Sequence, residues 1–366
     1  MRGGEKVLEV LCEIFPEADL YTIIHVPGSV SGIIEKRKIT TSFIQRLPGA
    51  RSRYRSFLPL FPMAVEGFDL SGYDLVVSSS HCAAKGVIPP SNALHVSYVH
   101  TPMRYVWDMY NDYFGPARTG FLKRKAIGVF AHYLRMWDIT SSARVDHYIA
   151  NSAHVARRIE KFYRRDSAVI HPPVDCSRFS ASNGDGGYYL VVSAFAPYKR
   201  IDIAVDAFNM LGKRLIIIGS GQDEKLLKSK ASSNIEFLGW KSDAELAAYY
   251  SGCRALIFTG EEDFGIVPLE AMASGRPVIA FARGGALETV VAPSSAEEGP
   301  TGLFFNEQTA GSLIDAVKAF EASVGEFVPE RVRRHALRFD RPIFKERLKE
   351  HIIGLYNGQR VKECDA

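Results

Sequence analysis

The sequence predicts an α/β protein built from two doubly wound, parallel-sheet domains. At 366 residues the chain is too long for one ordinary hydrophobic core. In both halves short apolar runs alternate with amphipathic stretches, which is typical of parallel strands joined by helices. Pro172-Pro173 interrupts this alternation near the middle of the chain. We therefore expect an N-terminal domain over residues 1–172 and a C-terminal domain over residues 173–341.

The expected strands are short runs rich in aliphatic and aromatic residues. They are residues 18–24, 75–77, 95–99 and 147–150 in the first domain, and 189–192, 215–218, 235–238, 255–258, 278–280 and 302–304 in the second. The segment Arg2-Gly3-Gly4 resembles a glycine loop that normally follows a first apolar strand, but no apolar run precedes it, so this strand is expected to be missing. Loss of a central strand would expose apolar edges and unpaired backbone groups. We hypothesise that the chain is truncated at its N-terminus or that its start is misassigned.

The small net charge of +4 is unevenly distributed. Residues 1–175 hold 22 Lys and Arg against 16 Asp and Glu, while the remainder holds 23 against 25. Two acid-free segments, residues 36–55 and 118–135, mix basic with aromatic and aliphatic residues. Such segments suit docking on an anionic membrane surface, or alternatively form a solvated face or the lining of an acceptor cleft. Nucleic-acid binding is disfavoured, because the halves differ modestly and no groove-reading motif is present.

The five cysteines are scattered, odd in number and without a Cys-x-x-Cys pair. This usage favours a reducing cytoplasm over a disulfide framework or a zinc site. No apolar run of about 18 residues is present, so any membrane role is expected to be peripheral, on the cytoplasmic face of the inner membrane.

The segment from Gly260 to Gly275 places two carboxylates, Glu262 and Glu270, on either side of a loop that runs into a helix. Pro268 is expected at the first helical position, with Glu270 in the first turn and Val267 at the N-cap. Because Val267 has no side-chain acceptor, the first amides of the helix lack a local partner. Such amides attract anions, and ionised carboxylates accept hydrogen bonds from hydroxyls. A nucleotide sugar is a ligand that combines phosphate with several hydroxyl groups.

This segment resembles the Glu-x7-Glu signature of the retaining, GT-B-fold glycosyltransferases of family four. The sequence from Glu262 to Gly275, followed by Arg283-Gly-Gly-Ala-Leu-Glu-Thr289, is similar to that of bacterial mannosyltransferases that build O-antigen and exopolysaccharide repeat units. Further matching stretches are His100 to Asp108, Asn151-Ser152, Pro172 to Asp175, Pro197 to Asp202 and Phe237 to Trp240. The resemblance covers nearly the whole chain. It implies two Rossmann-like domains facing a cleft, with a C-terminal helix over about residues 342–366 crossing back to the first domain.

The resemblance also implies roles for individual residues. Glu270 would bind the ribose hydroxyls, Glu262 would orient the transferred hexose together with the backbone amides of Phe264 and Gly265, and Lys199 would bind the diphosphate. His100 would contact the donor sugar or assist at the reaction centre, so His100, Lys199 and Glu262 are the candidate catalytic residues. Other donor-side candidates are Gly3, Gly4, Arg200, Gly219, Gly239, Trp240, Ile266 and Val267.

One departure from the family pattern concerns the second cation of the donor site. The family usually has an arginine a few residues before the lysine, where this chain has Ala194. We hypothesise that Arg200 replaces it, with a residue of the Arg2-Gly3-Gly4 loop as the alternative. On the acceptor side the candidates are His81, Arg104 and Asp108.

The expected reaction is transfer of mannose from GDP-mannose to a polyprenyl-diphosphate-linked saccharide, with retention of configuration. No Asp-x-Asp cluster stands where a diphosphate would bind, so transfer is expected to need neither a metal nor another cofactor. The alternatives are the same reaction with a UDP-sugar, and a nucleotide-sugar-binding protein without turnover. A GT-B sugar-nucleotide epimerase is disfavoured, because the two glutamates and the Phe-Gly loop match the transferase pattern more closely.

Overall fold

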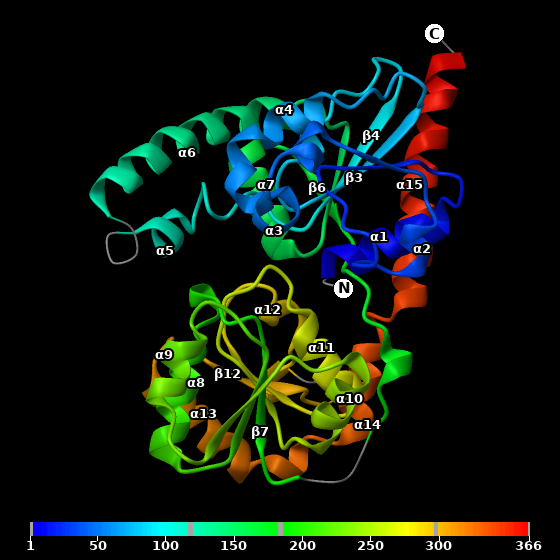
Figure 1. Ribbon diagram of the computed structural model, residues 1–366. Helices are drawn as coiled ribbons and strands as arrows, with labels where there is room; N and C mark the ends of the chain where they lie inside the picture. Colours follow the sequence, from blue (N-terminus) through cyan, green and yellow to red (C-terminus); the bar gives the residue numbers. More distant parts are fainter. Residues whose placement is uncertain (1–2, 116–119, 182–185, 296–298, 365–366) are drawn as a thin grey trace. The chain divides into compact units, whose positions relative to one another are not determined.

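The computed structural model describes residues 3–115, 120–181, 186–295 and 299–364. It divides into two compact units (Figure 1). Unit 1 comprises Met1–Pro173 and Phe344–Ala366, and unit 2 comprises Val174–Ile343. These boundaries lie within two residues of those expected from the sequence.

Unit 2 contains one sheet of six parallel strands in the order β12-β11-β10-β7-β8-β9. The strands are β7 (Tyr189–Val192), β8 (Leu215–Ile218), β9 (Ile235–Gly239), β10 (Leu256–Phe258), β11 (Val278–Phe281) and β12 (Gly302–Phe305). All six were predicted, with ends that differ by one residue at most. The strand order reverses between β7 and β10, which pair through Leu190 and Leu256. In such sheets this reversal is where ligands bind, outside the carboxyl ends of the strands.

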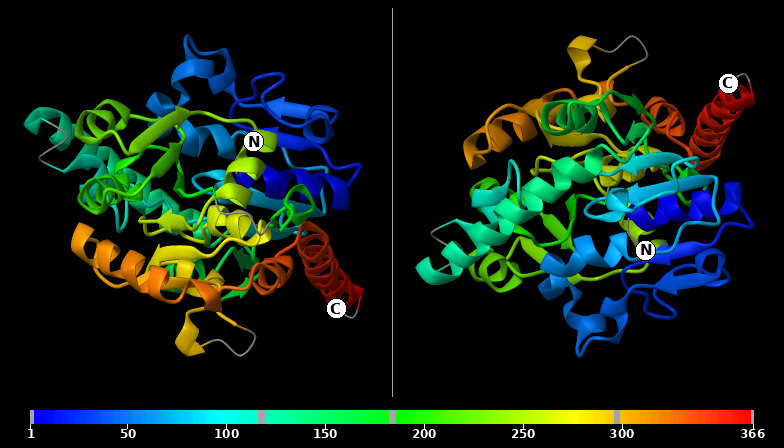
Figure 2. Two further views of the ribbon diagram at one scale, coloured as in Figure 1. Left: turned by 90° about the horizontal axis from the view of Figure 1, so that it is seen from below. Right: turned by 90° about the horizontal axis from the view of Figure 1, so that it is seen from above.

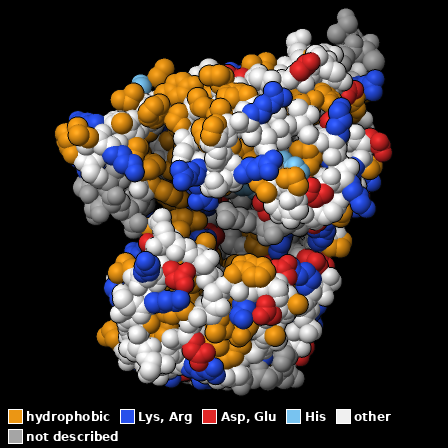
Figure 3. Space-filling model, in the orientation of Figure 1, with side chains coloured by type: hydrophobic (Ala, Val, Ile, Leu, Met, Phe, Trp, Pro, Cys, Tyr) orange, Lys and Arg blue, Asp and Glu red, His pale blue; other side chains and the backbone are white. Residues whose placement is uncertain are grey.

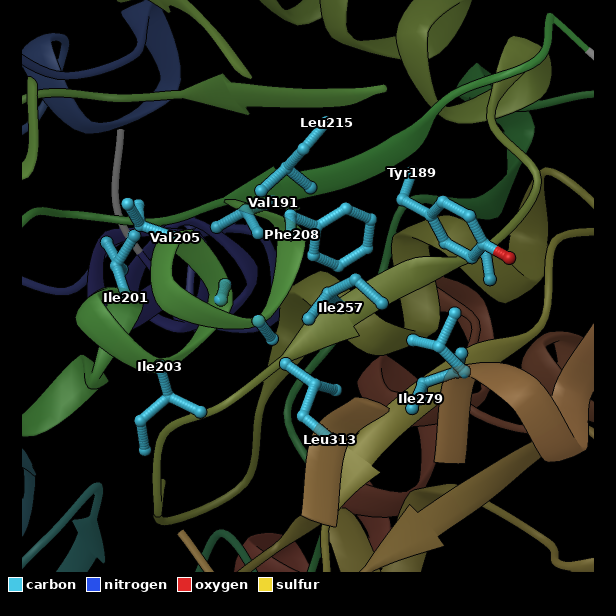
Figure 4. Packing of buried hydrophobic residues seen from close by; sticks show 14 of the residues in the cluster. Tyr189, Val191, Ile201, Ile203, Val205, Phe208, Leu215, Ile257, Ile279 and Leu313 are labelled. Atoms are coloured by element: carbon cyan, nitrogen blue, oxygen red, sulfur yellow. The ribbon is translucent and has the colours of Figure 1, made fainter. Parts of the chain in front are cut away.

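Helices cover both faces of the unit 2 sheet, because its strands carry apolar side chains on both sides. Tyr189 and Val191 point into a core that they share with α8 (Ile201–Leu211), α9 (Glu224–Lys230) and α13 (Ala310–Ala322) (Figure 4). Leu190 points the other way. The core on that face is shared with α10 (Asp243–Gly252), α11 (Ile266–Ala273), α12 (Ala286–Thr289) and α14 (Pro329–Leu337). The doubly wound arrangement follows from this alternation along each strand.

Unit 1 contains a four-stranded parallel sheet in the order β3-β4-β5-β6 and a separate parallel pair, β1-β2. The strands are β1 (Leu20–Thr22), β2 (Ile39–Thr41), β3 (Leu75–Ser80), β4 (Leu94–Val99), β5 (His147–Ala150) and β6 (Ser167–Val169). The three-residue strands β2 and β6 were not predicted, because they are half-buried and partly polar. The described residues begin with α1 (Gly3–Ile14).

One face of the unit 1 sheet is covered by α1 and α15 (Arg341–Cys364), which lie side by side (Figures 1 and 2). Val10 of α1 and Leu348 of α15 are fully buried there. Tyr98 of β4 packs edge-on against Phe344, with 5.9 Å between ring centroids. From Phe344 onward, α15 therefore belongs to the first unit.

A second core of unit 1 is formed by α4 (Phe61–Glu66), α6 (Phe121–Ser142) and the chain around them. The other helices of the unit are α2 (Gly32–Glu35), α3 (Ala50–Arg53), α5 (Tyr110–Phe114) and α7 (Ala153–Tyr163). Asp138, on the buried side of α6, pairs with Lys85 at 3.0 Å and accepts hydrogen bonds from Trp107 and Tyr163. This polar cluster ties α6 to α7 and to the segments that follow β3 and β4.

Candidate functional site

Lys199 and Glu262 form an ion pair beyond the carboxyl ends of β7 and β10, the two strands at which the sheet order reverses. Their side chains are only 14% and 20% exposed. The backbone brings them together as well: the Thr259 hydroxyl donates to the Lys199 carbonyl oxygen at 2.9 Å. A Cβ atom at Gly260 would lie 3.0 Å from the Lys199 Cα, so glycine allows this close approach. The structure thus joins two of the three predicted catalytic residues.

Helix α11 begins at Ile266, two residues before the predicted start at Pro268. Its N-cap is Gly265 rather than Val267. The prediction was wrong because Gly265 adopts a φ of +86°, which turns the chain into the helix earlier than the proline does. Glu270 consequently lies in the second turn of the helix and not in the first. The expectation of an uncapped start holds, since Gly265 makes no side-chain cap.

Glu270 is 9% exposed, and its Oε2 accepts a hydrogen bond from the Tyr250 hydroxyl at 2.9 Å. Phe264, which precedes the helix, is buried against the same core. The Phe264 ring is therefore part of the core and does not line this edge of the sheet.

The glycine turn after β8 packs against the loop that follows β7 and bonds to the last residue of β9. At Gly219 (φ +136°) a Cβ atom would lie 1.8 Å from the Ser193 carbonyl oxygen, so only glycine fits. The Gly219 amide donates to the Gly239 carbonyl oxygen at 2.9 Å. Trp240, the next residue, is 78% exposed. The predicted candidates Gly219, Gly239 and Trp240 thus all lie at the edge of the sheet that carries Lys199.

Sequence reasoning gave no role to the turn after β11, which supports the Glu262 backbone. At Gly284 (φ +67°) a Cβ atom would lie 2.3 Å from the Glu262 carbonyl oxygen, and the Gly285 amide donates to that oxygen at 2.8 Å. Arg283, which lies in this turn, is exposed. The sequence signal for this turn was Arg283-Gly284-Gly285, which belongs to the stretch that resembles the family but to which no function was assigned.

Arg200, the predicted second cation, stands beside Lys199 with a φ of +51°. Its guanidinium makes hydrogen bonds of 3.1–3.3 Å to Asp202 and reaches Gln308 at 3.5 Å. The arginine charge is therefore shared with a neighbouring acid. Ala194 lies in the loop between β7 and Lys199, as expected.

His100, the third predicted catalytic residue, belongs to unit 1 and follows β4. Its Nε2 bonds to the Ser79 hydroxyl at 2.8 Å, and its ring packs edge-on against Tyr98. Burial, with a smaller contribution from His81, lowers the pKa of His100 to about 3, so the imidazole is neutral at pH 7. A Cβ atom at Gly4 would lie 3.5 Å from His100 Nε2. Gly3 and Gly4 form the start of α1, while Arg2 lies outside the described residues.

Two of the acceptor-side candidates, Arg104 and Asp108, make polar contacts with other residues of unit 1. Asp108 pairs with Arg158 of α7 at 2.6 Å, and Arg158 also donates to the Thr101 hydroxyl. Arg104 reaches the same hydroxyl through Nε at 3.4 Å. These bonds hold the segment after β4 in place. His81 is exposed just beyond β3.

Across the described ranges, no three His, Cys, Asp or Glu side chains cluster in a way that could hold a metal ion. In the same residues no helix has the length and apolar character needed to cross a membrane. Cys12, Cys82, Cys176 and Cys253 are free thiols.

Comparison with known proteins assigns each half of the chain to a family model. Residues 1–178 match Glycosyltransferase Family 4, and residues 176–331 match Glycosyl transferases group 1. The O-antigen chain mannosyltransferase RfbU of Salmonella typhimurium is 32% identical over 164 residues, which is 40% of this chain and 45% of that protein. The chain spans about half the length of the curated relatives that it matches.

Solved structures show the same fold over almost the whole chain. Sucrose-phosphate synthase from Thermosynechococcus elongatus superposes with a TM-score of 0.71 at 18% identity, covering 96% of this chain and 92% of that one. HepE of Anabaena, in complex with UDP-glucose, gives a TM-score of 0.69 at 17% identity and covers 97% and 96%. At these identities the likeness concerns the fold alone.

Proposed function

Because this chain belongs to the family-four glycosyltransferases with the GT-B fold, we propose that it transfers a hexose from a nucleotide sugar to a saccharide acceptor, with retention of configuration. The observation that carries the proposal is the Lys199–Glu262 pair at the strand reversal of unit 2. There the Lys199 ammonium, which can bind phosphate, is in direct contact with the Glu262 carboxylate, which can bind sugar hydroxyls. Of the two, the Lys199 ammonium can stabilise the negative charge that develops on a leaving nucleoside diphosphate.

In this proposal different residues of unit 2 bind the different parts of the donor. Lys199 binds the diphosphate, so the phosphate must compete with Glu262 for the ammonium group. Glu262 and the amides of Phe264 and Gly265 then hold the hexose, and Glu270 accepts hydrogen bonds from the ribose. The exposed Trp240 offers an aromatic face for the base.

We favour GDP-mannose as the donor because the sequence from Glu262 to Gly275 is similar to that of mannosyltransferases. In addition, RfbU, an O-antigen chain mannosyltransferase, is among the relatives. A UDP-sugar is the second candidate, since the HepE structure holds UDP-glucose. Lys199 and the start of α11 supply positive charge to the diphosphate, so we propose that transfer needs no metal ion. Activity that is lost in EDTA and restored by Mg²⁺ or Mn²⁺ would contradict this.

The test is a thermal-shift panel of GDP, UDP, ADP and dTDP, because a ligand that binds only the folded state raises its melting temperature. We expect the largest shift with GDP, and its loss in the Lys199→Ala variant. Slow hydrolysis of GDP-mannose without acceptor would then establish turnover. Tight binding without hydrolysis or transfer would instead identify a nucleotide-sugar-binding protein, and a shift with UDP alone would move the donor to the UDP-sugars.

The acceptor that we propose, a polyprenyl-diphosphate-linked saccharide, resides in a membrane, and α6 of unit 1 is suited to reach it. Seven large apolar residues of this helix are exposed: Phe121, Leu122, Val129, Phe130, Tyr133, Met136 and Ile139. Of these, Val129, Met136 and Ile139 lie on the side of the helix opposite the buried face that carries Leu134. Lys123, Arg124 and Lys125 add positive charge at its first turn. Figure 3 shows hydrophobic and basic side chains together on the surface of unit 1.

We therefore propose that α6 docks on an anionic membrane surface. Of the two basic segments expected to do so, residues 36–55 are the weaker candidate. Of the apolar residues in and just after that segment, Phe61 is buried, and Leu47, Phe57 and Leu58 pack against the core. Arg118, at the start of the second segment, lies outside the described residues.

Cosedimentation with phosphatidylglycerol-containing vesicles tests this docking. The variant Val129→Ser/Met136→Ser should lose vesicle binding while keeping its GDP-induced thermal shift. Phe43→Ser/Tyr54→Ser, which removes exposed aromatic residues of the first segment, is the matched control and should bind as the unchanged protein does. Equal loss in both variants, or in neither, would contradict docking through α6.

A further inference from the structure

Tyr250 lies on α10 and makes its hydroxyl bond with a side chain of the proposed donor site. The residue is completely buried, and its ring packs edge-on against Phe179 with 5.8 Å between centroids. Its hydroxyl donates to Glu270 Oε2 on α11 at 2.9 Å. Burial, together with the Glu270 charge, raises the pKa of Tyr250 well above its usual value, so the hydroxyl remains a donor at any physiological pH.

A neighbouring tyrosine shows that this bond is not the only way to satisfy a buried hydroxyl here. Tyr188 donates its hydroxyl to the backbone carbonyl oxygen of Tyr249, also on α10, at 2.8 Å. Buried tyrosine hydroxyls need a partner, and a backbone carbonyl is sufficient. Tyr250 instead uses a carboxylate that is nearly buried itself. Such a carboxylate keeps one orientation only if hydrogen-bond donors hold it.

We propose that Tyr250 is a positioning residue that orients Glu270 toward the ribose of the nucleotide and so contributes to selectivity for ribonucleotides. This inference rests on the proposed function, in which Glu270 accepts hydrogen bonds from the ribose hydroxyls. A carboxylate has about four lone-pair positions, so one bond from Tyr250 does not exhaust its capacity. The bond helps to fix the rotation of the carboxylate plane, and with it the direction of the other lone pairs.

The experiment compares Tyr250→Phe with Tyr188→Phe in the full chain. The probes are GDP and UDP, each beside its 2′,3′-dideoxy form, with dissociation constants measured by calorimetry. For the nucleotide that binds, Tyr250→Phe should weaken affinity about tenfold, and the donor KM should rise more than kcat falls. Affinity for the dideoxy form should change less than twofold, so the preference for ribose shrinks. Tyr188→Phe, which also removes a buried hydroxyl bond at α10, should leave both affinities within twofold.

A double-mutant cycle with Glu270→Gln shows whether the effect passes through Glu270. In that background Tyr250→Phe should have little additional effect, since the carboxylate that it orients is gone. Equal weakening of ribo and dideoxy nucleotides, or full additivity of the two changes, would overturn the inference while the proposed function stands. If Glu270→Gln itself leaves nucleotide affinity unchanged, the ribose assignment fails and the role of Tyr250 fails with it. A thermal melt of Tyr250→Phe confirms that the variant is folded.

Discussion

The two units use their polar side chains differently. In unit 2, Lys199 and Glu262 pair where strands end, and glycines bring the backbone close around them. In unit 1, the polar residues after β4 are bound to neighbouring helices: Asp108 to Arg158, and Trp107 to Asp138. In unit 2 an ion pair thus lies at the edge where we propose that the donor binds, while these polar groups of unit 1 hold its own segments together. Changes at these pairs of unit 1 should mainly affect stability, and changes at the unit 2 edge mainly activity.

The largest effect is expected for Asp138→Asn. Removing this charge leaves the buried ammonium of Lys85 without its counter-ion, which costs about 3–5 kcal/mol of unfolding free energy. Urea unfolding measures the loss. The double variant Lys85→Met/Asp138→Asn should recover much of it, because no unpaired charge remains and the amide oxygen still accepts hydrogen bonds from Trp107 and Tyr163. A single variant as stable as the unchanged protein would contradict the structural role of this cluster.

Lys199→Ala tests whether the carboxyl edge of the unit 2 sheet contributes mainly to activity. We expect kcat/KM to fall about 100- to 1000-fold, because a cation at the leaving diphosphate is removed. The melting temperature should change little. The matched control is Lys213→Ala, which breaks a lysine–glutamate pair with Glu321 before β8, at the amino end of that strand. Comparable activity losses in both variants would show that the effect is not specific to the carboxyl edge.

A third prediction concerns the pH dependence of unit 1 stability. Burial lowers the pKa of His95 to about 4, below the value of about 6.5 in an unfolded chain. Between these values only the unfolded state takes up a proton, so stability is complete above pH 6.5 and is lost as the pH falls toward 4. From pH 7 to pH 5 the loss due to His95 should be about 2 kcal/mol.

Urea unfolding at the two pH values measures this loss. His95→Gln should be less stable at pH 7, yet should lose about 2 kcal/mol less on acidification. His132→Gln, on the exposed face of α6, is the control and should follow the unchanged protein. An identical pH dependence in all three proteins would contradict the assignment.

The smallest effect is expected for Arg200→Ala, about three- to tenfold in nucleoside diphosphate affinity, because this exposed charge is already shared with Asp202. Arg283→Ala serves as the comparison, with a change below threefold. If Arg200→Ala leaves both kcat and the affinity unchanged, the assignment of the second cation to Arg200 is wrong. A larger loss with Arg283→Ala would move that role to the turn after β11.

Prediction from sequence succeeded where the determining signal is local. All six strands of unit 2 were located, since buried parallel strands are continuous apolar runs bounded by glycine or charged residues. It failed at β2 and β6, which are too short and too polar to show a period. It also failed at the start of α11, where the φ of Gly265 decides the turn, and a φ angle cannot be read from residue type.

The sequence by itself therefore determined the two-unit α/β organisation, the family and the order of the candidate groups along the chain, because periodicity, proline and glycine act over a few residues. Only the tertiary structure decided which of these groups meet. Lys199 reaches Glu262 because β7 and β10 are neighbours in the sheet, and Tyr250 reaches Glu270 because α10 and α11 cover the same face. Which side of α6 is buried was likewise settled by packing, since both of its faces carry apolar residues.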